Sequence, residues 1–357
     1  MRMNNCETKI KGRISEVHRE FFHVISEKGE TRARVKGAFY KENREFPVIG
    51  DYVLMRYNPY GDCVIEEVYP RKSVFKRPNQ SGHAAGFVKS LKEQVLAANF
   101  DYVFIVASLN QNYNLNRIAR YVTVTVQGGA KPVVILTKAD LCNEIDSYIE
   151  EVKGISDQVK VCAVSAIAGK GMEELTPYLT EGITIALLGS SGVGKSTLVN
   201  AIAGEEVMKV SEIREVDSKG RHTTTHRQLI QLPLGVSFID TPGIRELGML
   251  DVEEGIEDVF SDIKEYLGLC KFSNCSHQTE PGCAIKQAIA DNEISMERWK
   301  LYCQLRNEND WGLQRATGIK RQRDQYEKNK LKEKNKPKDK NKTKEMNKSN
   351  EMDRGVI

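Results

Sequence analysis

The chain has 357 residues, of which 40% are hydrophobic and 29% charged, and its net charge is +4. This composition is typical of a globular protein with two or three domains. It contains no apolar run of 18 residues and no apolar core near its N-terminus, so we expect neither a transmembrane helix nor a signal peptide. We therefore expect a cytoplasmic protein that does not bind membranes. Residues 315–357 hold 15 Lys and Arg against 7 Asp and Glu, so the basic excess belongs to this tail.

Residues 7–70 have the pattern of a small β-barrel. Short stretches of β-forming residues are separated by turn sequences such as Lys28-Gly29 and Asn58-Pro59-Tyr60-Gly61. Five short strands with little helix predict an OB-like barrel, although an SH3-like barrel has a similar pattern. The candidate strands are Lys9–Val17, Phe21–Ser26, Thr31–Gly37, Asp51–Tyr57 and Asp62–Val68.

The centre of the chain alternates between buried strands and helices. A polar connector at residues 73–98 leads into a predicted helix at Ser90–Ala98. Continuous apolar runs at Tyr102–Ala107, Pro132–Leu136 and Ile183–Leu188 are typical of strands buried on both faces. The alternation predicts a mostly parallel α/β sheet covered by helices. Further strands are predicted at Lys160–Val164 and Gly235–Ile239, and helices at Leu115–Val126, Asn143–Lys153, Met172–Leu179 and from Lys195.

The strand at Ile183–Leu188 leads into a phosphate loop. Gly189-Ser190-Ser191-Gly192-Val193-Gly194-Lys195-Ser196 matches the pattern GxxxxGK[ST]. Its glycines let backbone N–H groups converge on phosphate oxygens without side-chain clashes. We expect Lys195 to bind the β- and γ-phosphates and Ser196 to ligate Mg²⁺, and we count Thr197 among the nucleotide-binding residues. The loop alone does not distinguish GTP from ATP.

Two short motifs predict that the base is guanine. Thr137-Lys138-Ala139-Asp140 matches the pattern [NT]KxD, in which both oxygens of the Asp accept hydrogen bonds from guanine N1–H and N2–H₂. Adenine lacks such a pair of donors. Ser165-Ala166, after the strand at Lys160–Val164, is the small dipeptide expected to donate a backbone N–H to the guanine oxygen. These residues predict GTP and GDP as ligands.

The motifs for Mg²⁺ and the γ-phosphate follow the phosphate loop. Asp240-Thr241-Pro242-Gly243 matches DxxG, so we expect Asp240 to reach Mg²⁺ through water and the Gly243 N–H to reach the γ-phosphate. Upstream, one of Thr223, Thr224 and Thr225 is expected to complete the Mg²⁺ shell, and the choice among them stays open. Ordinary GTPases place the phosphate loop before the base-recognition motifs, so this order is circularly permuted. A parallel sheet tolerates the permutation because its original termini can be joined and new ones opened in a loop.

A cluster of metal-ligating residues lies further along the chain. Cys270, Cys275, His277 and Cys283 fall within 14 residues. Three thiolates and one imidazole form a closed tetrahedral shell, which predicts one structural Zn²⁺ rather than a catalytic metal. A disulfide is the alternative, and the reducing conditions of the cytosol disfavour it.

Four parts follow from these patterns. We expect an OB-like β-barrel at residues 1–72, a circularly permuted α/β P-loop GTPase domain at residues 73–249, and a mainly helical zinc-binding domain at residues 250–313, with helices at Gly255–Leu267 and Ser295–Asn309. The Lys-rich tail at residues 314–357 is expected to be largely disordered, because it has too few apolar residues to bury. Nothing in the sequence suggests an obligate oligomer, so we expect a monomer.

These residues resemble the circularly permuted GTPases of the ribosome small subunit-dependent GTPase A family. The similarity spans residues 7–313 and rests on the permuted order, on the Cys/His cluster and on three short segments. Thr137 departs from the family pattern, which usually has Asn there, and the Lys-rich tail is an addition. The segments are Glu93-Gln94-Val95-Leu96-Ala97-Ala98-Asn99, Gly220-Arg221-His222-Thr223-Thr224-Thr225 and Asp240-Thr241-Pro242-Gly243-Ile244-Arg245-Glu246.

The resemblance implies an OB domain, a GTPase that uses Mg²⁺, and a zinc domain. It also implies binding to the small ribosomal subunit and its rRNA, stimulation of GTP hydrolysis by that subunit, and a role in its late maturation. Whether the basic tail binds RNA phosphates or is only a solvated extension stays open.

No residue for orienting the attacking water is obvious. Ras-like proteins have a Gln shortly after the DxxG glycine, whereas Ile244-Arg245 follows Gly243 here. We hypothesise that the isolated enzyme is slow, that Lys195 is catalytic, and that His222 orients the water once a partner completes the site. Two other functions stay open. One is a P-loop ATPase or kinase, which Asp140 argues against, and the other is a non-catalytic RNA-binding adaptor in which nucleotide is structural.

Overall fold

The computed structural model describes residues 8–42, 44–77, 94–110, 112–209, 228–240 and 252–314. Contacts divide the chain into two units, residues 1–310 and residues 311–357, and the architecture below concerns the first. Among the described residues, no helix has both the length and the apolar character needed to span a membrane. The predicted disordered stretch at residues 315–357 lies outside the described residues.

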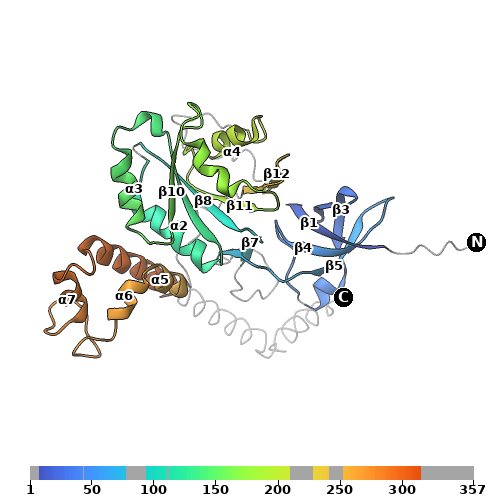
Figure 1. Cartoon of the computed structure of the whole chain (residues 1–357). Coiled ribbons are helices and arrows are strands. Elements are labelled where there is room, and N and C mark those ends of the chain that lie inside the picture. The colour runs from blue at the N-terminus through green and yellow to red at the C-terminus, as the bar shows by residue number, and fades with distance from the viewer. Residues whose placement is uncertain are drawn as a thin grey trace, which may run out of the picture. The chain divides into compact units, whose positions relative to one another are not determined.

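The N-terminal strands form a closed five-stranded barrel, as predicted. Strand β1 pairs with both β2 and β4, and the order β1-β2-β3-β5-β4 closes the barrel (Figure 1). Strands β3 and β5 pair in parallel, and the other pairs are antiparallel. Buried apolar residues such as Ile14, Val24 and Met55 fill it, which confirms the OB-like barrel. The strands are β1 (Lys9–Val17), β2 (Phe22–Ser26), β3 (Gly29–Val35), β4 (Tyr52–Arg56) and β5 (Cys63–Val68), with helix α1 (Ala38–Lys41) between β3 and β4.

The central region is the predicted parallel sheet. Five neighbouring strands run in parallel in the order β10-β9-β8-β11-β13, and β12 pairs antiparallel with β13. The consecutive strands β8, β9 and β10 are neighbours in the sheet, and a helical crossover connects each to the next, as parallel pairing requires. The strands are β8 (Tyr102–Ser108), β9 (Lys131–Thr137), β10 (Lys160–Val164), β11 (Thr184–Leu188), β12 (Gln228–Gln231) and β13 (Ser237–Asp240).

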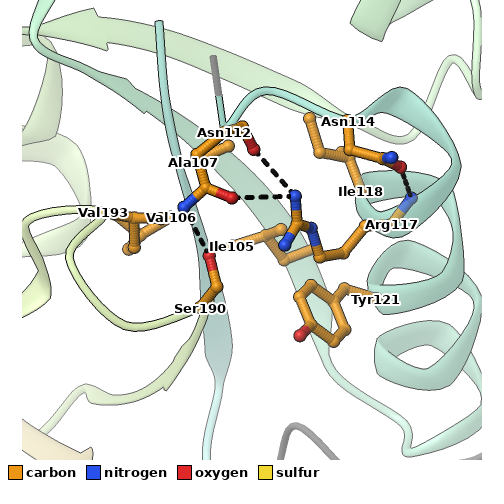
Figure 2. A pocket seen from close by; sticks show the side chains of 10 residues that line it. All are labelled: Ile105, Val106, Ala107, Asn112, Asn114, Arg117, Ile118, Tyr121, Ser190 and Val193. Atoms are coloured by element: carbon orange, nitrogen blue, oxygen red, sulfur yellow. Dashed lines mark hydrogen bonds between the residues drawn. The ribbon is translucent and has the colours of Figure 1, made fainter. Parts of the chain in front are cut away.

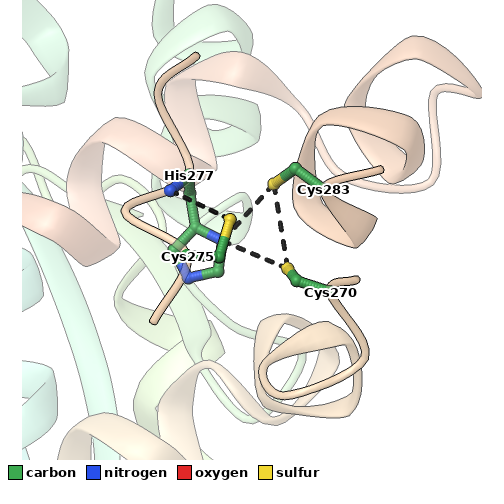
Figure 3. Close-up of side chains that lie close together, drawn as sticks. All are labelled: Cys270, Cys275, His277 and Cys283. Atoms are coloured by element: carbon green, nitrogen blue, oxygen red, sulfur yellow. Dashed lines mark hydrogen bonds between the residues drawn. The ribbon is translucent and has the colours of Figure 1, made fainter. Parts of the chain in front are cut away.

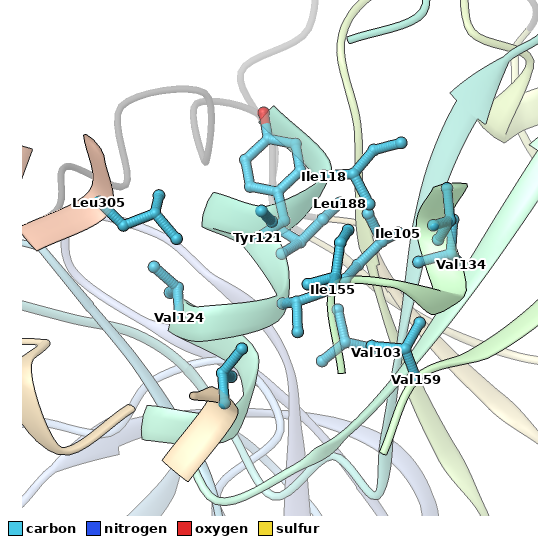
Figure 4. Close-up of a cluster of buried hydrophobic side chains, with 14 of the residues drawn as sticks. Val103, Ile105, Ile118, Tyr121, Val124, Val134, Ile155, Val159, Leu188 and Leu305 are labelled. Atoms are coloured by element: carbon cyan, nitrogen blue, oxygen red, sulfur yellow. The ribbon is translucent and has the colours of Figure 1, made fainter. Parts of the chain in front are cut away.

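Helices cover both faces of this sheet. Alternate residues of β8 point to opposite sides, so Val103 and Ile105 pack in one cluster and Phe104 and Val106 in another. The first cluster includes residues of α2 (Leu115–Gln127) and α3 (Ile145–Lys153), and part of it is drawn in Figure 4. The second includes residues of η2 (Met172–Tyr178) and α4 (Lys195–Ala203). Burial on both faces explains why these strands are continuously apolar.

The C-terminal helices bury side chains in the same hydrophobic cluster as α2, and α5 packs directly on α2. They are α5 (Glu253–Val259), α6 (Ser261–Tyr266), α7 (Ala284–Ala290) and a helical segment that begins at residue 296. The Gly255 N–H donates to Gln127 Oε1 at 2.6 Å, and a Cβ at position 255 would lie 2.7 Å from the Thr123 carbonyl oxygen. A glycine is therefore needed where α5 approaches α2 so closely. Arg120 on α2 also donates two hydrogen bonds of 2.9 Å to the Glu308 carboxylate.

The barrel and the central sheet form one continuous hydrogen-bonded ladder. Glu16 of β1 pairs with Gln228 of β12, so β1 belongs to the barrel and also extends the large sheet. Arg13 reinforces this junction, because its guanidinium donates to Thr184 Oγ1 at 2.7 Å and to the Asn99 carbonyl at 3.0 Å. Burial lowers the pKa of Arg13 from its ordinary value.

Three predicted helices differ from the structure. Residues Gln94–Ala98 form strand β7, paired with β6 (Val74–Arg77), rather than the end of a helix at Ser90–Ala98. Sheet pairing here overrides the helix propensity of Leu and Ala. The helix predicted at Met172–Leu179 is the 3₁₀ helix η2, which contains Pro177 and cannot form regular α-helical bonds there. The helix predicted at Gly255–Leu267 is divided into α5 and α6 at the fully buried Phe260.

Candidate nucleotide and metal sites

The predicted nucleotide motifs meet at one edge of the sheet. Thr137 ends β9, Asp240 ends β13, and Ser165 and Gly189 directly follow β10 and β11. These four strands are parallel, so their carboxyl ends lie on the same side. In open α/β sheets this edge is where ligands bind. The circular permutation therefore changes the order of the motifs along the chain and leaves their convergence intact.

The phosphate loop has the backbone that its glycines permit. Gly189, Gly192 and Gly194 have φ values of +150°, +76° and +97°, and a Cβ at position 189 would lie 2.4 Å from the Val106 carbonyl oxygen. Helix α4 begins at Lys195 directly after the loop, so its N-terminal N–H groups lie beside it. Lys195 Nζ donates to the Gly189 and Ser190 carbonyls at 2.9 and 2.8 Å. The lysine ammonium thus lies against the loop where phosphate charge is expected.

The predicted base-recognition segment is hydrogen-bonded to the phosphate loop. The Thr137 hydroxyl is buried and donates to the Val193 carbonyl at 2.6 Å. Lys138 has a left-handed backbone with φ of +61°, and its Nζ donates to the Gly192 carbonyl at 3.3 Å. Asp140 lies one turn further on, in η1 (Ala139–Leu141), and its side chain is exposed. Thr137 thus connects the two loops directly.

The Ser165-Ala166 dipeptide has one N–H already committed. The Ser165 N–H donates to the Lys170 carbonyl at 2.9 Å, and Ser165 Oγ accepts a hydrogen bond from the Ala168 N–H at 3.1 Å. Ser165 is buried and therefore shapes this turn. The Ser165 N–H is therefore already bonded within this turn, and the Ala166 N–H is the better candidate to contact the guanine oxygen.

Asp240 lies within electrostatic reach of Lys195. Burial raises the pKa of Asp240 above its ordinary value, and the positive charge of Lys195 opposes this shift. A carboxylate beside the phosphate-loop lysine is placed to bind an Mg²⁺ hydration shell. The other predicted switch residues, His222, Thr223, Thr224, Thr225 and Gly243, lie outside the described residues.

A polar network beside the phosphate loop was not predicted from the sequence. Figure 2 shows a pocket between the loop and α2 in which Asn112 Nδ2 donates to Ser190 Oγ at 3.2 Å. Arg117 in turn donates to the Asn112 carbonyl at 2.7 Å and to its Oδ1 at 3.2 Å. Asn114 caps α2 by accepting the Arg117 N–H at 2.8 Å. In the sequence, only the run of asparagines after a buried strand could have indicated this network. The fold shows that Asn112 of this run contacts Ser190.

The four predicted zinc ligands are brought together in the C-terminal region (Figure 3). His277 Nδ1 lies 3.5 Å from Cys270 Sγ and 3.4 Å from Cys283 Sγ, and these two sulfurs are 3.9 Å apart. With Zn–S of about 2.3 Å and Zn–N of about 2.05 Å, a tetrahedral shell has S···N edges of about 3.6 Å and S···S edges of about 3.8 Å. The ligand spacing therefore fits a tetrahedral metal ion.

Backbone N–H groups support the sulfur ligands. The Ala284 N–H donates to Cys270 Sγ and the His277 N–H to Cys275 Sγ, both at 3.4 Å. Such bonds orient ligands and stabilise thiolate charge. Trp299 packs edge-on against the His277 ring, with centroids 5.5 Å apart. The seven cysteines in the described part of the chain are free, so no disulfide competes with the metal there.

Comparison with known proteins decides the family. The model of the RsgA GTPase family matches residues 68–250. A protein of Listeria innocua named small ribosomal subunit biogenesis GTPase RsgA 1 is 42% identical over 303 residues, which cover 84% of each chain. This chain belongs to the RsgA GTPase family. It is therefore a GTP-hydrolysing enzyme.

Solved structures agree with the fold of the RsgA family. YjeQ from Thermotoga maritima matches 84% of this chain and 97% of its own, with 27% identity and a TM-score of 0.63. YloQ, described as a circularly permuted GTPase, matches 86% of this chain and 97% of its own, with 25% identity and a TM-score of 0.59. The family match at residues 68–250 contains every predicted nucleotide motif, from Thr137 to Gly243.

Proposed function

We propose that this GTPase binds the small ribosomal subunit and its rRNA, acts in the late maturation of that subunit, and is stimulated by it in GTP hydrolysis. Two relatives, from Listeria innocua and Methanosarcina acetivorans, carry names that assign them to small ribosomal subunit biogenesis. The observation that carries the GTPase part is the pair of hydrogen bonds from Thr137 and Lys138 to the phosphate loop. Base recognition and phosphate binding are thereby coupled within one site.

The residues of this site have distinct proposed roles. Asp140 accepts hydrogen bonds from guanine N1–H and N2–H₂, and the Ala166 N–H donates to the guanine oxygen. Lys195 and the N–H groups of the loop, including Gly194, bind the phosphates, while Ser196 and Asp240 hold Mg²⁺ directly and through water. When bound, Mg²⁺ neutralises charge that develops on the phosphate oxygens. One of Thr223, Thr224 and Thr225 completes the Mg²⁺ shell, and the Gly243 N–H binds the γ-phosphate.

Two supporting features belong to the same proposal. Cys270, Cys275, His277 and Cys283 hold one structural Zn²⁺, because four protein ligands leave no open position for chemistry. The functional divisions are the barrel at residues 1–72, the GTPase domain at 73–249, the zinc domain at 250–313 and the tail at 314–357. We propose a cytoplasmic monomer.

Steady-state hydrolysis tests the proposal. Purified protein is assayed with GTP and with ATP, in the presence and absence of isolated small ribosomal subunits, with Lys195→Ala as the inactive control. GTP-selective turnover that rises strongly with subunits is expected, since no water-orienting Gln follows Gly243. GTP turnover that the subunits leave unchanged would reject the stimulation. Nucleotide binding without multiple turnover, even with subunits, would favour an adaptor in which the nucleotide is structural.

The role of His222 is tested in the same assay. We propose that it orients the attacking water when the subunit is bound. His222→Ala should then lose most of the subunit-stimulated rate while binding GDP with unchanged affinity. Full stimulated turnover by His222→Ala would exclude this role.

A further inference from the structure

A second group of metal-ligating side chains lies on the barrel, outside the nucleotide site and the Cys/His cluster. Glu16 near the end of β1, His18 just beyond it, and His23 on β2 each offer one ligand atom, and these atoms lie within 4.8 Å of one another. All three side chains are partly exposed, so an ion can reach them from solvent. We propose that Glu16, His18 and His23 bind one divalent transition-metal ion, with Zn²⁺ as the natural occupant.

A β-bulge places Glu16 on the same face as His23. The register between β1 and β2 shifts by one residue between Ile14 and Glu16, so that Glu16 lies directly opposite His23. Ile14 and Ser15 are both buried although they are consecutive, which is the burial expected at a bulge. With an unshifted register, Ser15 would face His23 and the carboxylate would lie on the other side. The bulge therefore directs a metal-ligating group toward the imidazoles.

The hairpin turn holds the two histidines close together. The His18 N–H donates to the Phe21 carbonyl at 3.0 Å, which closes the turn between β1 and β2. The His18 ring stacks on Phe21 with centroids 4.4 Å apart, and it meets the His23 ring at 5.4 Å. Packing thus restricts both imidazoles before any ion binds, which lowers the entropic cost of coordination.

The chemistry of these three ligands suits zinc. Imidazole nitrogen and carboxylate oxygen are common Zn²⁺ ligands, and two bound to the same tetrahedral ion lie about 3.4 Å apart. His18 Nε2 lies 2.9 Å from Glu16 Oε2, a hydrogen-bond distance that has to lengthen by about 0.5 Å for both atoms to bind one ion. Glu30 Oε1 is 3.5 Å from His23 Nδ1, so this carboxylate or a water can take the fourth position.

One nearby positive charge opposes a cation at this place. Arg32 pairs with His23 in the β2–β3 register. Its guanidinium, however, lies 2.9 Å from the Asp62 carboxylate and stacks over the Phe21 ring at 4.4 Å. Asp62 also pairs with Arg34 at 2.6 Å, so it balances the charge of Arg32 only in part. The proposed site contains the carboxylate of Glu16 and has that of Glu30 beside it.

Metal stoichiometry tests the proposal directly. Zinc is titrated into the full-length protein and bound metal is counted per chain after gel filtration. We expect the wild type to bind one equivalent more than the double variant His18→Asn/His23→Asn. Glu27→Gln, which removes an exposed carboxylate elsewhere on the same barrel, should bind as much zinc as the wild type. Equal stoichiometry in the wild type and the double variant would overturn the proposal.

A spectroscopic measurement needs no variant and identifies the ligand type. Co²⁺ is added to protein already loaded with zinc at its thiolate site. The proposed site should produce visible d–d absorption without a thiolate-to-cobalt charge-transfer band, because its ligands are nitrogen and oxygen. Visible absorption no stronger than that of aqueous Co²⁺ would reject the site, and so would absorption accompanied only by a thiolate band, which would place the cobalt at the cysteines.

Discussion

The hydroxyl of Thr137 provides a sharp test of how the base-recognition segment and the phosphate loop are coupled. Thr137→Val keeps the shape of the side chain and removes its only donor. Thr137 is 4% exposed, and its hydroxyl donates to the Val193 carbonyl at 2.6 Å. The substitution leaves this carbonyl without its partner, at a cost of about 1–3 kcal/mol. If the free variant can hydrate this carbonyl and the nucleotide complex cannot, the cost falls on binding and GDP affinity should drop roughly 5- to 140-fold; if neither state can hydrate it, the cost appears in the free energy of unfolding.

Two measurements distinguish a loss of nucleotide affinity from a loss of stability in Thr137→Val. Fluorescent GDP titration measures nucleotide affinity, and urea unfolding without nucleotide measures the free energy of unfolding. Thr137→Ser retains the hydroxyl and should stay close to the wild type. Thr125→Val removes another buried threonine hydroxyl, which donates to the Tyr121 carbonyl at 2.7 Å within α2, and should leave GDP affinity unchanged. If Thr137→Val binds GDP as the wild type does and is equally stable, the inferred coupling is wrong.

Three further substitutions test other parts of the protein. Asp140→Asn should weaken GTP binding by roughly 100-fold. The same variant should bind xanthosine triphosphate better, because the 2-oxo group of xanthine can accept a hydrogen bond from the new amide. Unchanged GTP binding would contradict the guanine assignment. Arg71→Ala removes the two hydrogen bonds of 2.8 Å that Arg71 donates to the fully buried Asp51. Urea denaturation should show a free energy of unfolding lower by about 3–5 kcal/mol. The control Arg34→Ala, which removes an exposed partner of Asp62, should lower it by about 0–1 kcal/mol. Glu280→Gln should speed zinc release to a chromophoric chelator. Hydrogen bonds from the Ser276 hydroxyl and from backbone N–H groups, including those of Ser276 and Gln278, hold this carboxylate in the metal loop and lower its pKa to about 2. An unchanged release rate would show that the loop does not depend on it.

The motifs that bind small ligands could be predicted because they are local in the sequence. The phosphate loop needs glycines and a lysine at fixed spacing, and the structure gives Gly189, Gly192 and Gly194 positive φ values. The Cys/His cluster is equally local, and its spacing predicted the four residues that lie together. Continuous apolar runs likewise predicted the parallel strands, since burial on both faces leaves no polar alternation.

Features that depend on pairing between distant segments were missed. Gln94–Ala98 has good helix formers, and only its partner strand β6 makes it β7. The contact of Asn112 with Ser190 joins residues 78 positions apart, and no local pattern indicates it. The link from Thr137 to Val193 also spans 56 positions, so the sequence predicted a role for the threonine in base recognition and not its bond to the phosphate loop.

The sequence by itself determined the chemistry of this protein: a phosphate loop, a carboxylate suited to guanine, and a shell of three thiolates and an imidazole, each encoded within a few neighbouring residues. The tertiary structure decided how these parts are connected. Strand register selects which side chains share a face, as the bulge that turns Glu16 toward His23 illustrates. Register and packing follow from the free energy of the whole fold, so they cannot be obtained from any short segment of the chain.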